Sequence, residues 1–296
     1  MKWVAWRQYR LELIICLVVL VVLAAFLIPE RLQRHALYPT VVTLIGFVPL
    51  IIGALLASPV ILDFEQRTYR LAWTQSITRR RWLVTKLGFA LIVAIIFSTF
   101  LSVLTGWYLA PQERLGSPFN YFAQHGIMPV VYAVFAFALA LVLGAWSKRT
   151  ALAVIVALVV CFAAVTAVGS GLRPHYMTPV EQVNTITSPP TMNGTPHEQI
   201  PIGAWIVDSY YIDASGKRLS HLPWSNSIIE SPDVSGNGTS HLPTSNESIE
   251  YPVREVVEYQ PAGRFWPFQG IESSIFLGIS VMLLGTTIWV VTRRMR

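Results

Sequence analysis

The densest cluster of charged and aromatic side chains in the sequence is the stretch EQRTYRLAWTQSITRRRWLVTK, from Glu65 to Lys86. Helical spacing places an aromatic stripe on one face of this stretch and most of its charges elsewhere. The stripe consists of Tyr69, Ala72, Trp73, Ser76 and Ile77. This pattern is typical of an amphipathic helix that lies parallel to a membrane, and its chemistry is that of binding. A basic topology signal would need only Arg79-Arg80-Arg81, so it leaves the stripe unexplained.

Residue patterns that carry catalysis or metal binding are missing from the sequence. It contains no GxxxxGK[ST] phosphate loop, no HExxH and no GxSxG. Cys16 and Cys161 fall in apolar runs and form no CxxC pair. The six histidines lie at span ends or outside the spans, where they cannot hold a haem within the bilayer. We therefore expect no metal site, no cofactor in this chain and no enzyme activity, and we disfavour an intramembrane enzyme.

Composition places the chain in a membrane. Hydrophobic residues make up 53% of the sequence and charged residues 13%. Six runs are apolar over the roughly 20 residues that cross a bilayer core. They are Leu11–Ile28, Pro39–Leu62, Leu83–Leu109, Gly126–Trp146, Ala151–Leu172 and Ile271–Val291. We interpret the first run as a retained span, because no small-residue cleavage site precedes Pro29.

The charge distribution predicts the orientation of these spans. With both termini inside, the inner segments hold 14 of the 22 Lys and Arg residues and 3 of the 16 Asp and Glu residues, a net charge of +11. The outer segments then carry −5. Basic residues accumulate on the cytoplasmic side, so we predict that both termini are cytoplasmic and that the basic excess faces lipid and not nucleic acid. Ion-coupled carriers bury ionisable groups inside their spans, and such groups are almost absent from the spans of this sequence. We therefore expect the energy source to lie elsewhere.

Two membrane segments should differ from plain apolar helices. Span two contains Pro39, Pro49 and Pro59, which predict a kinked helix that packs on protein, since freed backbone groups need partners inside a bilayer. The other segment is the N-terminus, where tryptophans at helical spacing predict an anchor in the membrane interface. The residues that we expect to anchor the chain at the membrane surface are Trp3, Trp6, Arg79, Arg80, Arg81 and Trp82.

The region 173–270 differs in composition from the spans and is rich in Pro, Ser, Asn and Gly. We divide the chain into 1–172, with a cytoplasmic loop at 63–82, an extracytoplasmic domain at 173–270, and span six with its tail at 271–296. Trp205–Ile212 and Val253–Tyr259 are predicted strands. SHLPWSNSIIESP at 220–232 and SHLPTSNESIEYP at 240–252 share nine of thirteen residues, which we interpret as a local duplication. The predicted fold class is an all-α polytopic membrane protein with six transmembrane helices and a small β-containing domain between spans five and six.

With this organisation the sequence resembles permease subunits of the ABC-2 class of ATP-binding-cassette transporters. The motifs that carry the resemblance are Glu65-Gln66-Arg67-Thr68, LAWTQSITRRRWLVTK at 71–86 and YQPAGRFWPFQGIE at 259–272. They are similar to segments of bacterial permeases in one branch of the class. The region 173–270 is far larger than the short re-entrant hairpins of many relatives.

The resemblance implies a dimeric permease that works with two copies of a separate ATPase, which binds ATP and Mg, to export an amphipathic or hydrophobic substrate across a bacterial cell membrane. In that family the loop between spans two and three contains the coupling helix. Carried over to this sequence, Glu65, Arg67 and Arg70 are polar partners of the ATPase, and Tyr69 and Trp73 form the docking face. The alternative is a membrane-anchored receptor or scaffold whose outer domain senses a ligand, although an anchor needs no irregular span.

Overall fold

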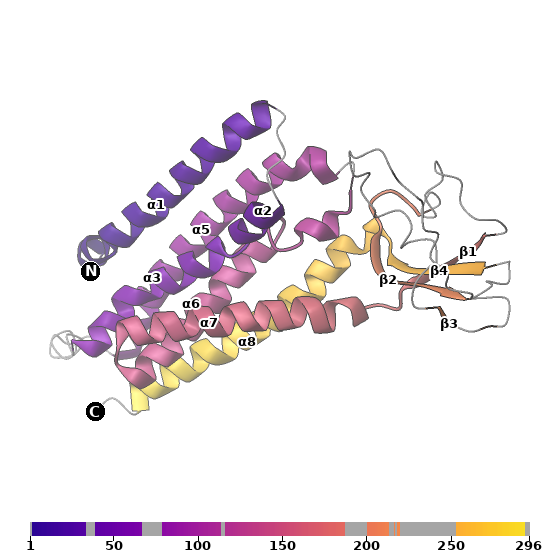
Figure 1. Cartoon of the computed structure of the whole chain (residues 1–296). Coiled ribbons are helices and arrows are strands. Elements are labelled where there is room, and N and C mark those ends of the chain that lie inside the picture. The colour runs from indigo at the N-terminus through magenta and orange to yellow at the C-terminus, as the bar shows by residue number, and fades with distance from the viewer. Residues whose placement is uncertain are drawn as a thin grey trace, which may run out of the picture. The chain divides into compact units, whose positions relative to one another are not determined.

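The computed structural model describes residues 2–33, 39–66, 79–113, 116–186, 200–212, 216, 218–219 and 253–293. These residues form two compact units (Figure 1). The first unit comprises Met1–Tyr176 together with Arg264–Arg296, and the second comprises Met177–Gly263. The first unit consists of helices and the second is built around a sheet.

Six helices of the first unit are long and apolar enough to cross a membrane, as the sequence predicts. Their elements are α1 (Lys2–Leu32), α2 and α3 (Pro39–Ile45 and Val48–Glu65), α5 (Arg79–Glu113), α6 (Met128–Ser147), α7 (Thr150–Ala167) and α8 (Phe265–Arg293). Short 3-10 turns, η1 and η5, occupy Pro118–Tyr121 and Ala262–Arg264, and α7 continues into a π-helical turn, η2 (Val168–Leu172), and a 3-10 turn, η3 (Arg173–His175). The side of the membrane on which each end lies stays a prediction.

The helical unit has two ends, a loop end and a distal end. The loop end contains the start of α1, the end of α3, the start of α5, the connection between α6 and α7, and the end of α8 (Figure 1). The distal end contains η1, the start of α6, η2, η3 and the start of α8. The chain leaves the first unit after Tyr176, forms the second unit, and re-enters the first unit at Arg264.

Span two is broken, which confirms the prediction of a kinked helix. α2 ends at Ile45 and α3 begins at Val48, and Pro49 lies in the first turn of α3, where a missing N–H costs least. The Val42 carbonyl accepts from the Gly46 N–H at 3.3 Å and also from Nε2 of the Gln124 side chain at 3.4 Å, so a side chain from another part of the chain adds a partner near the break. Backbone groups freed by a kink inside a bilayer need such partners, and Gln124 is 7% exposed.

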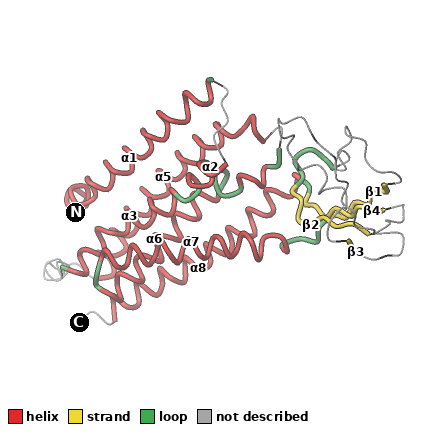
Figure 2. The backbone as a smooth tube through the Cα atoms, in the orientation of Figure 1, coloured by secondary structure: helices red, strands yellow, loops and turns green. Residues whose placement is uncertain are grey.

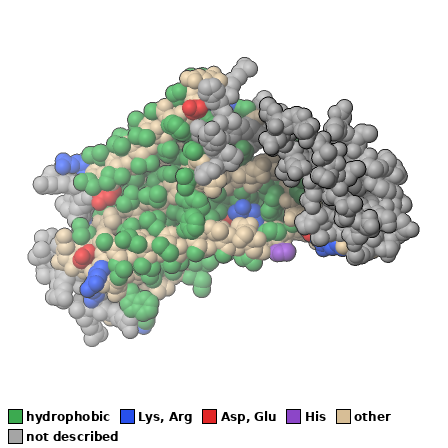
Figure 3. Space-filling view, in the orientation of Figure 1, with side chains coloured by type: hydrophobic (Ala, Val, Ile, Leu, Met, Phe, Trp, Pro, Cys, Tyr) green, Lys and Arg blue, Asp and Glu red, His purple; other side chains and the backbone are tan. Residues whose placement is uncertain are grey.

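The core of the first unit lies around α6, in which fourteen of twenty residues are buried. α6 contacts α3, α5, α7 and α8. α3 lies directly against α6 at Gly53, where a Cβ would overlap the backbone carbonyl of Ala133. Apolar side chains also cover much of the outside of the helices (Figure 3), as expected for a surface that faces lipid or another apolar partner.

The second unit contains one antiparallel sheet with the strand order β1-β4-β2-β3 (Figure 2). The strands are β1 (Val180–Ile186), β2 (Trp205–Ile212), β3 (Arg218–Leu219) and β4 (Val253–Gln260). β2 and β4 confirm the two predicted strands, and the sheet between spans five and six confirms the predicted fold class. β1, which pairs Val183 with Val256, was not predicted. The repeat at 220–232 and 240–252 lies outside the described residues.

A buried carboxylate fixes the centre of this sheet. Glu255 of β4 is fully buried and accepts hydrogen bonds from the Tyr211 hydroxyl at 3.1 Å and from the Asn184 amide at 3.4 Å. Burial, and then the neighbouring Glu255 carboxylate, raise the pKa of Tyr211 to about 12. Tyr211 therefore stays a hydroxyl donor at neutral pH, and three strands are joined through one side chain.

Replacing Gly53 with alanine should lower the thermal unfolding midpoint of the protein purified in detergent, because the new Cβ forces α3 away from the backbone of α6. Overpacking of this kind costs about 1–3 kcal/mol. Gly144→Ala should also lower the midpoint, because its Cβ would overlap Cγ2 of the fully buried Ile61 side chain. The matched control is Gly278→Ala, whose Cβ has no heavy atom within 4 Å. Equal midpoints for Gly53→Ala and Gly278→Ala would contradict the close packing.

Candidate functional site

The segment with the predicted coupling residues lies between the end of α3 at Glu65 and the start of α5 at Arg79. Arg67, Tyr69, Arg70 and Trp73 lie outside the described residues, so their roles stay predictions. The structure does describe the elements that hold both ends of this segment, and these define the candidate site.

An ion pair joins the two helices on either side of the segment. Lys86 of α5 donates from Nζ to Asp63 Oδ2 of α3, and the two side chains are only 13% and 8% exposed. The Lys86 ammonium also lies 4.9 Å from the centroid of the Trp82 ring, within the range of a cation–π interaction. Removing one partner of a buried ion pair leaves an uncompensated charge, so this pair holds the end of α3 against α5.

The Glu65 carboxylate binds the start of α7. Its Oε2 accepts from the Thr150 backbone N–H at 2.8 Å and from the Thr150 hydroxyl at 2.6 Å. A carboxylate at this position satisfies a free N–H group and interacts favourably with the helix dipole. Arg149 occupies the N-cap position but makes no side-chain capping bond, so Glu65 caps the helix from a distant part of the chain.

This contact gives Glu65 a partner that sequence reasoning missed. The sequence suggests Glu65 as a polar partner of an ATPase, whereas the described partner is Thr150, 85 residues away. The two-residue connection of Lys148 and Arg149 brings Thr150 to the loop end, and Lys148 has the left-handed conformation with φ 53°. Only the three-dimensional arrangement of spans two, four and five reveals this pairing.

Trp82 is placed differently from its predicted position at the lipid surface. Its side chain is 5% exposed and belongs to the main apolar cluster of the helices. Helical geometry explains this burial. α5 begins at Arg79, and Trp82 lies one turn before Lys86, so both side chains are on the face of α5 that carries the ion pair to α3. Tyr9 of α1 is fully buried in the same cluster, and its ring centroid is 5.3 Å from that of Phe89.

The remaining predicted anchors lie in helices whose first residues have no described side chains. Trp3 and Trp6 belong to α1, and Arg79 and Arg80 open α5, where Arg81 is exposed. Three arginines at a helix start oppose the helix dipole, so they do not stabilise α5 itself. Their anchoring role stays a prediction.

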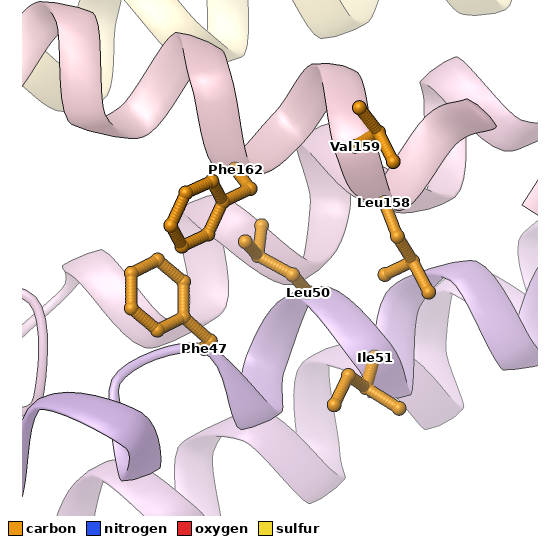
Figure 4. Close-up of a pocket in the computed structure, with 6 residues that line it drawn as sticks. All are labelled: Phe47, Leu50, Ile51, Leu158, Val159 and Phe162. Atoms are coloured by element: carbon orange, nitrogen blue, oxygen red, sulfur yellow. The ribbon is translucent and has the colours of Figure 1, made fainter. Parts of the chain in front are cut away.

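A shallow apolar groove of about 350 Å³ lies between span two and span five (Figure 4). It is lined by Phe47, Leu50, Ile51, Leu158, Val159 and Phe162. The rings of Phe47 and Phe162 pack against one another at one side of the groove, with centroids 4.8 Å apart. The groove can accept an apolar surface or chain but offers no polar side chain for recognition.

In the described ranges, no group of three or more His, Cys, Asp or Glu residues could hold a metal ion. At the candidate site, Asp63, Glu65 and Lys86 join the ends of spans two, three and five on either side of the segment.

Comparison with known proteins identifies one family. A family model described as ABC-2 membrane transporter related matches residues 27–173, about half of the chain and including both helices that flank the candidate site. No curated protein and no solved structure matches the chain. Because the match begins at residue 27 and ends at residue 173, it is spans two to five that place the chain in the ABC-2 membrane transporter related family.

Proposed function

We propose that this chain is the membrane permease subunit of an exporter driven by a separate ATP-binding-cassette ATPase, which docks on residues 66–78. The observation that carries the proposal is the Glu65–Thr150 contact, because it makes the start of span five depend on the last residue of span two. The family match supports a permease role, and the sequence motifs support the position of the docking segment.

The geometry of the loop end explains how a force on this segment would reach several spans. The segment leaves α3 one residue after Glu65 and enters α5 at Arg79. Asp63 and Lys86 hold these helices together, and Glu65 holds α7. A displacement of the segment by the ATPase would therefore move spans two, three and five together. ATP and Mg would bind only to the ATPase, since this sequence contains no phosphate loop.

The transported substance is proposed to be amphipathic or hydrophobic. The groove between spans two and five supports this class of substrate, because its lining is apolar. We further propose that the permease works as a dimer with a second copy of itself, with both termini in the cytoplasm of a bacterial cell. A membrane-anchored receptor or scaffold would need neither an ATPase nor a force-bearing loop, so the ATPase interaction distinguishes the two functions.

Replacing Trp73 with alanine should abolish co-purification of the ATPase subunit and transport. A buried aromatic anchor at an interface contributes roughly 2 kcal/mol or more, which corresponds to about a 30-fold loss of affinity. Membrane insertion should persist, since Arg79-Arg80-Arg81 is unchanged. Co-purification from membranes, quantified against the wild type, measures the loss.

The matched control for this variant is Trp146→Ala. Trp146 is the penultimate residue of α6, at the loop end, and is 75% exposed, so its removal tests the general effect of losing an exposed tryptophan there. Normal ATPase binding by Trp73→Ala, or equal losses in both variants, would refute the docking role of the segment.

Replacing Glu65 with alanine should uncouple ATP hydrolysis from transport while the ATPase still binds. Removing the Glu65 carboxylate takes away the cap of α7 and frees span five from span two. Thr150→Val, which removes only the hydroxyl donor, should produce a weaker form of the same defect, and Thr150→Ser should resemble the wild type. The ratio of transport to ATP hydrolysis in proteoliposomes measures the effect. If Glu65→Ala loses the ATPase and Thr150→Val has no effect, Glu65 contacts the ATPase directly and the capping role is refuted.

A further inference from the structure

The motif FWPFQGIE contains two polar residues, Gln269 and Glu272, that the loop end does not use. Both lie in the first turns of α8 at the distal end, and both are essentially buried, with exposures of 1% and 0%. Polar side chains in a membrane-spanning bundle are costly unless their hydrogen bonds are satisfied, so their partners indicate what they do.

Glu272 binds four donor groups from two other parts of the bundle. Arg173 donates from Nε to Oε2 at 2.9 Å and from Nη2 to Oε1 at 3.0 Å. The hydroxyl of Tyr132 in α6 donates to Oε1 at 2.6 Å, and that of Tyr176 donates to Oε2 at 3.4 Å. Glu272 therefore ties the chain that follows span five to spans four and six.

Arg173 is held on its other face by an aromatic ring. Its guanidinium carbon lies 3.9 Å from the centroid of the Phe122 ring, and its side chain is 14% exposed. Phe122 belongs to an aromatic cluster with Phe119 and Phe265, so Arg173 occupies a packed pocket and not a solvated surface.

Gln269 fixes the wall of this pocket. Its amide donates to the carbonyls of Phe122 and His125 at 3.3 and 3.1 Å, and its Oε1 accepts from the Ile127 N–H at 3.0 Å. Gly126 has φ +73°, and a Cβ there would overlap the Gln269 amide, so only glycine fits. The pocket wall is therefore rigid, whereas Arg173 enters from a segment with a different geometry.

That segment is the π-helical turn η2, Val168–Leu172, which immediately precedes Arg173. The Arg173 N–H donates to the Val168 carbonyl, five residues back, and the turn contains Gly169 and Gly171. π-turns are rare and frequently occur at functional sites. Return of this turn to α-helical bonding would rotate the following residue by about 100°, which would take the Arg173 side chain off Glu272.

We propose that Arg173 and Glu272 form a latch that closes the distal end of span five against spans four and six, and that the π-turn is the element that opens it. The latch rests on the proposed permease function, in which it positions the distal end and does not contact substrate. When Arg173 leaves, the Tyr132 hydroxyl still donates to Glu272, so the carboxylate keeps a partner in the open state.

The distance between spans five and six at this end tests the latch in the permease alone. Ser170 and Ser274 are both exposed, on η2 and α8, and can be replaced by spin-labelled cysteines in a chain whose Cys16 and Cys161 are alanine. Dilution with unlabelled protein in liposomes removes distances between copies. The wild type should give one narrow distance distribution, and Glu272→Gln or Arg173→Gln should add a longer population.

Two further variants separate the latch from a loss of fold. Arg173→Lys keeps the positive charge but loses the paired hydrogen bonds of the guanidinium, so it should give a smaller fraction of the same longer population. This variant tests the ion pair if Glu272→Gln does not fold. Deleting Gly171 should convert the π-turn to α-helical bonding. The distance between the two spin labels should then be the longer one, although Arg173 and Glu272 are both present. The matched control is Asp208→Asn, which breaks the exposed pair of Asp208 and Arg218 at 2.9 Å and should leave the distribution unchanged.

The outcomes that overturn the latch are specific. Folded Glu272→Gln or Arg173→Lys with the wild-type distribution would refute the role of the ion pair, and a Gly171 deletion with that distribution would refute the role of the π-turn. In the assembled complex, ATP with vanadate should shift the wild type to the longer distance. Absence of this shift, together with opening in the variants, would refute the coupling to an ATPase and leave the latch established.

Discussion

The helical unit depends on the close approach of α3 to α6, where Gly53 leaves no space between its own Cα and the Ala133 carbonyl. The neighbouring residue of α6, Tyr132, donates a hydrogen bond at 2.6 Å to Glu272 of α8. Two consecutive residues of one buried helix therefore contact span two on one side and span six on the other. Because a close-packed interior deforms little, α6 can keep these two spans in register.

The polar groups of the bundle are concentrated where the helices end or break. Asp63, Glu65 and Lys86 lie at the loop end, and Arg173 and Glu272 lie at the distal end. Gln124 adds a partner near the break of span two. Between these positions the helices pack through apolar and small side chains, as is required where no water can satisfy a backbone or side-chain dipole. Contacts that can be broken and remade thus lie at the two ends, with a closely packed region between them.

The sequence predicts the parts of the fold that depend on local pattern. The lengths of the apolar runs predict all six spans, and the prolines of span two predict its break. The β-prone residues of Trp205–Ile212 predict a strand. β1 escapes prediction because VEQVNTI mixes polar and β-branched residues without strict alternation. Trp82 is assigned to the lipid surface because its position beside three arginines is typical of an anchor, whereas packing within the main apolar cluster decides its burial.

The contacts of the candidate site escape prediction for a different reason. Glu65 and Thr150 are 85 residues apart, and Arg173 and Glu272 are 99 apart, so no local pattern joins them. The motifs at 65–86 and 259–272 mark the right segments, yet they do not identify the partner of either carboxylate. Those partners follow from which helices α6 brings together.

The most direct test of the account is site-specific photo-crosslinking in native membranes, with a photoreactive amino acid at position 69 in the segment between α3 and α5. Position 266 in α8, where Trp266 is 64% exposed at the distal end, provides the comparison. Light should join position 69, but not position 266, to a separate ATP-binding-cassette ATPase. Absence of any ATPase adduct from position 69, in a chain that is inserted and folded, would contradict the claim that this segment receives the force for transport.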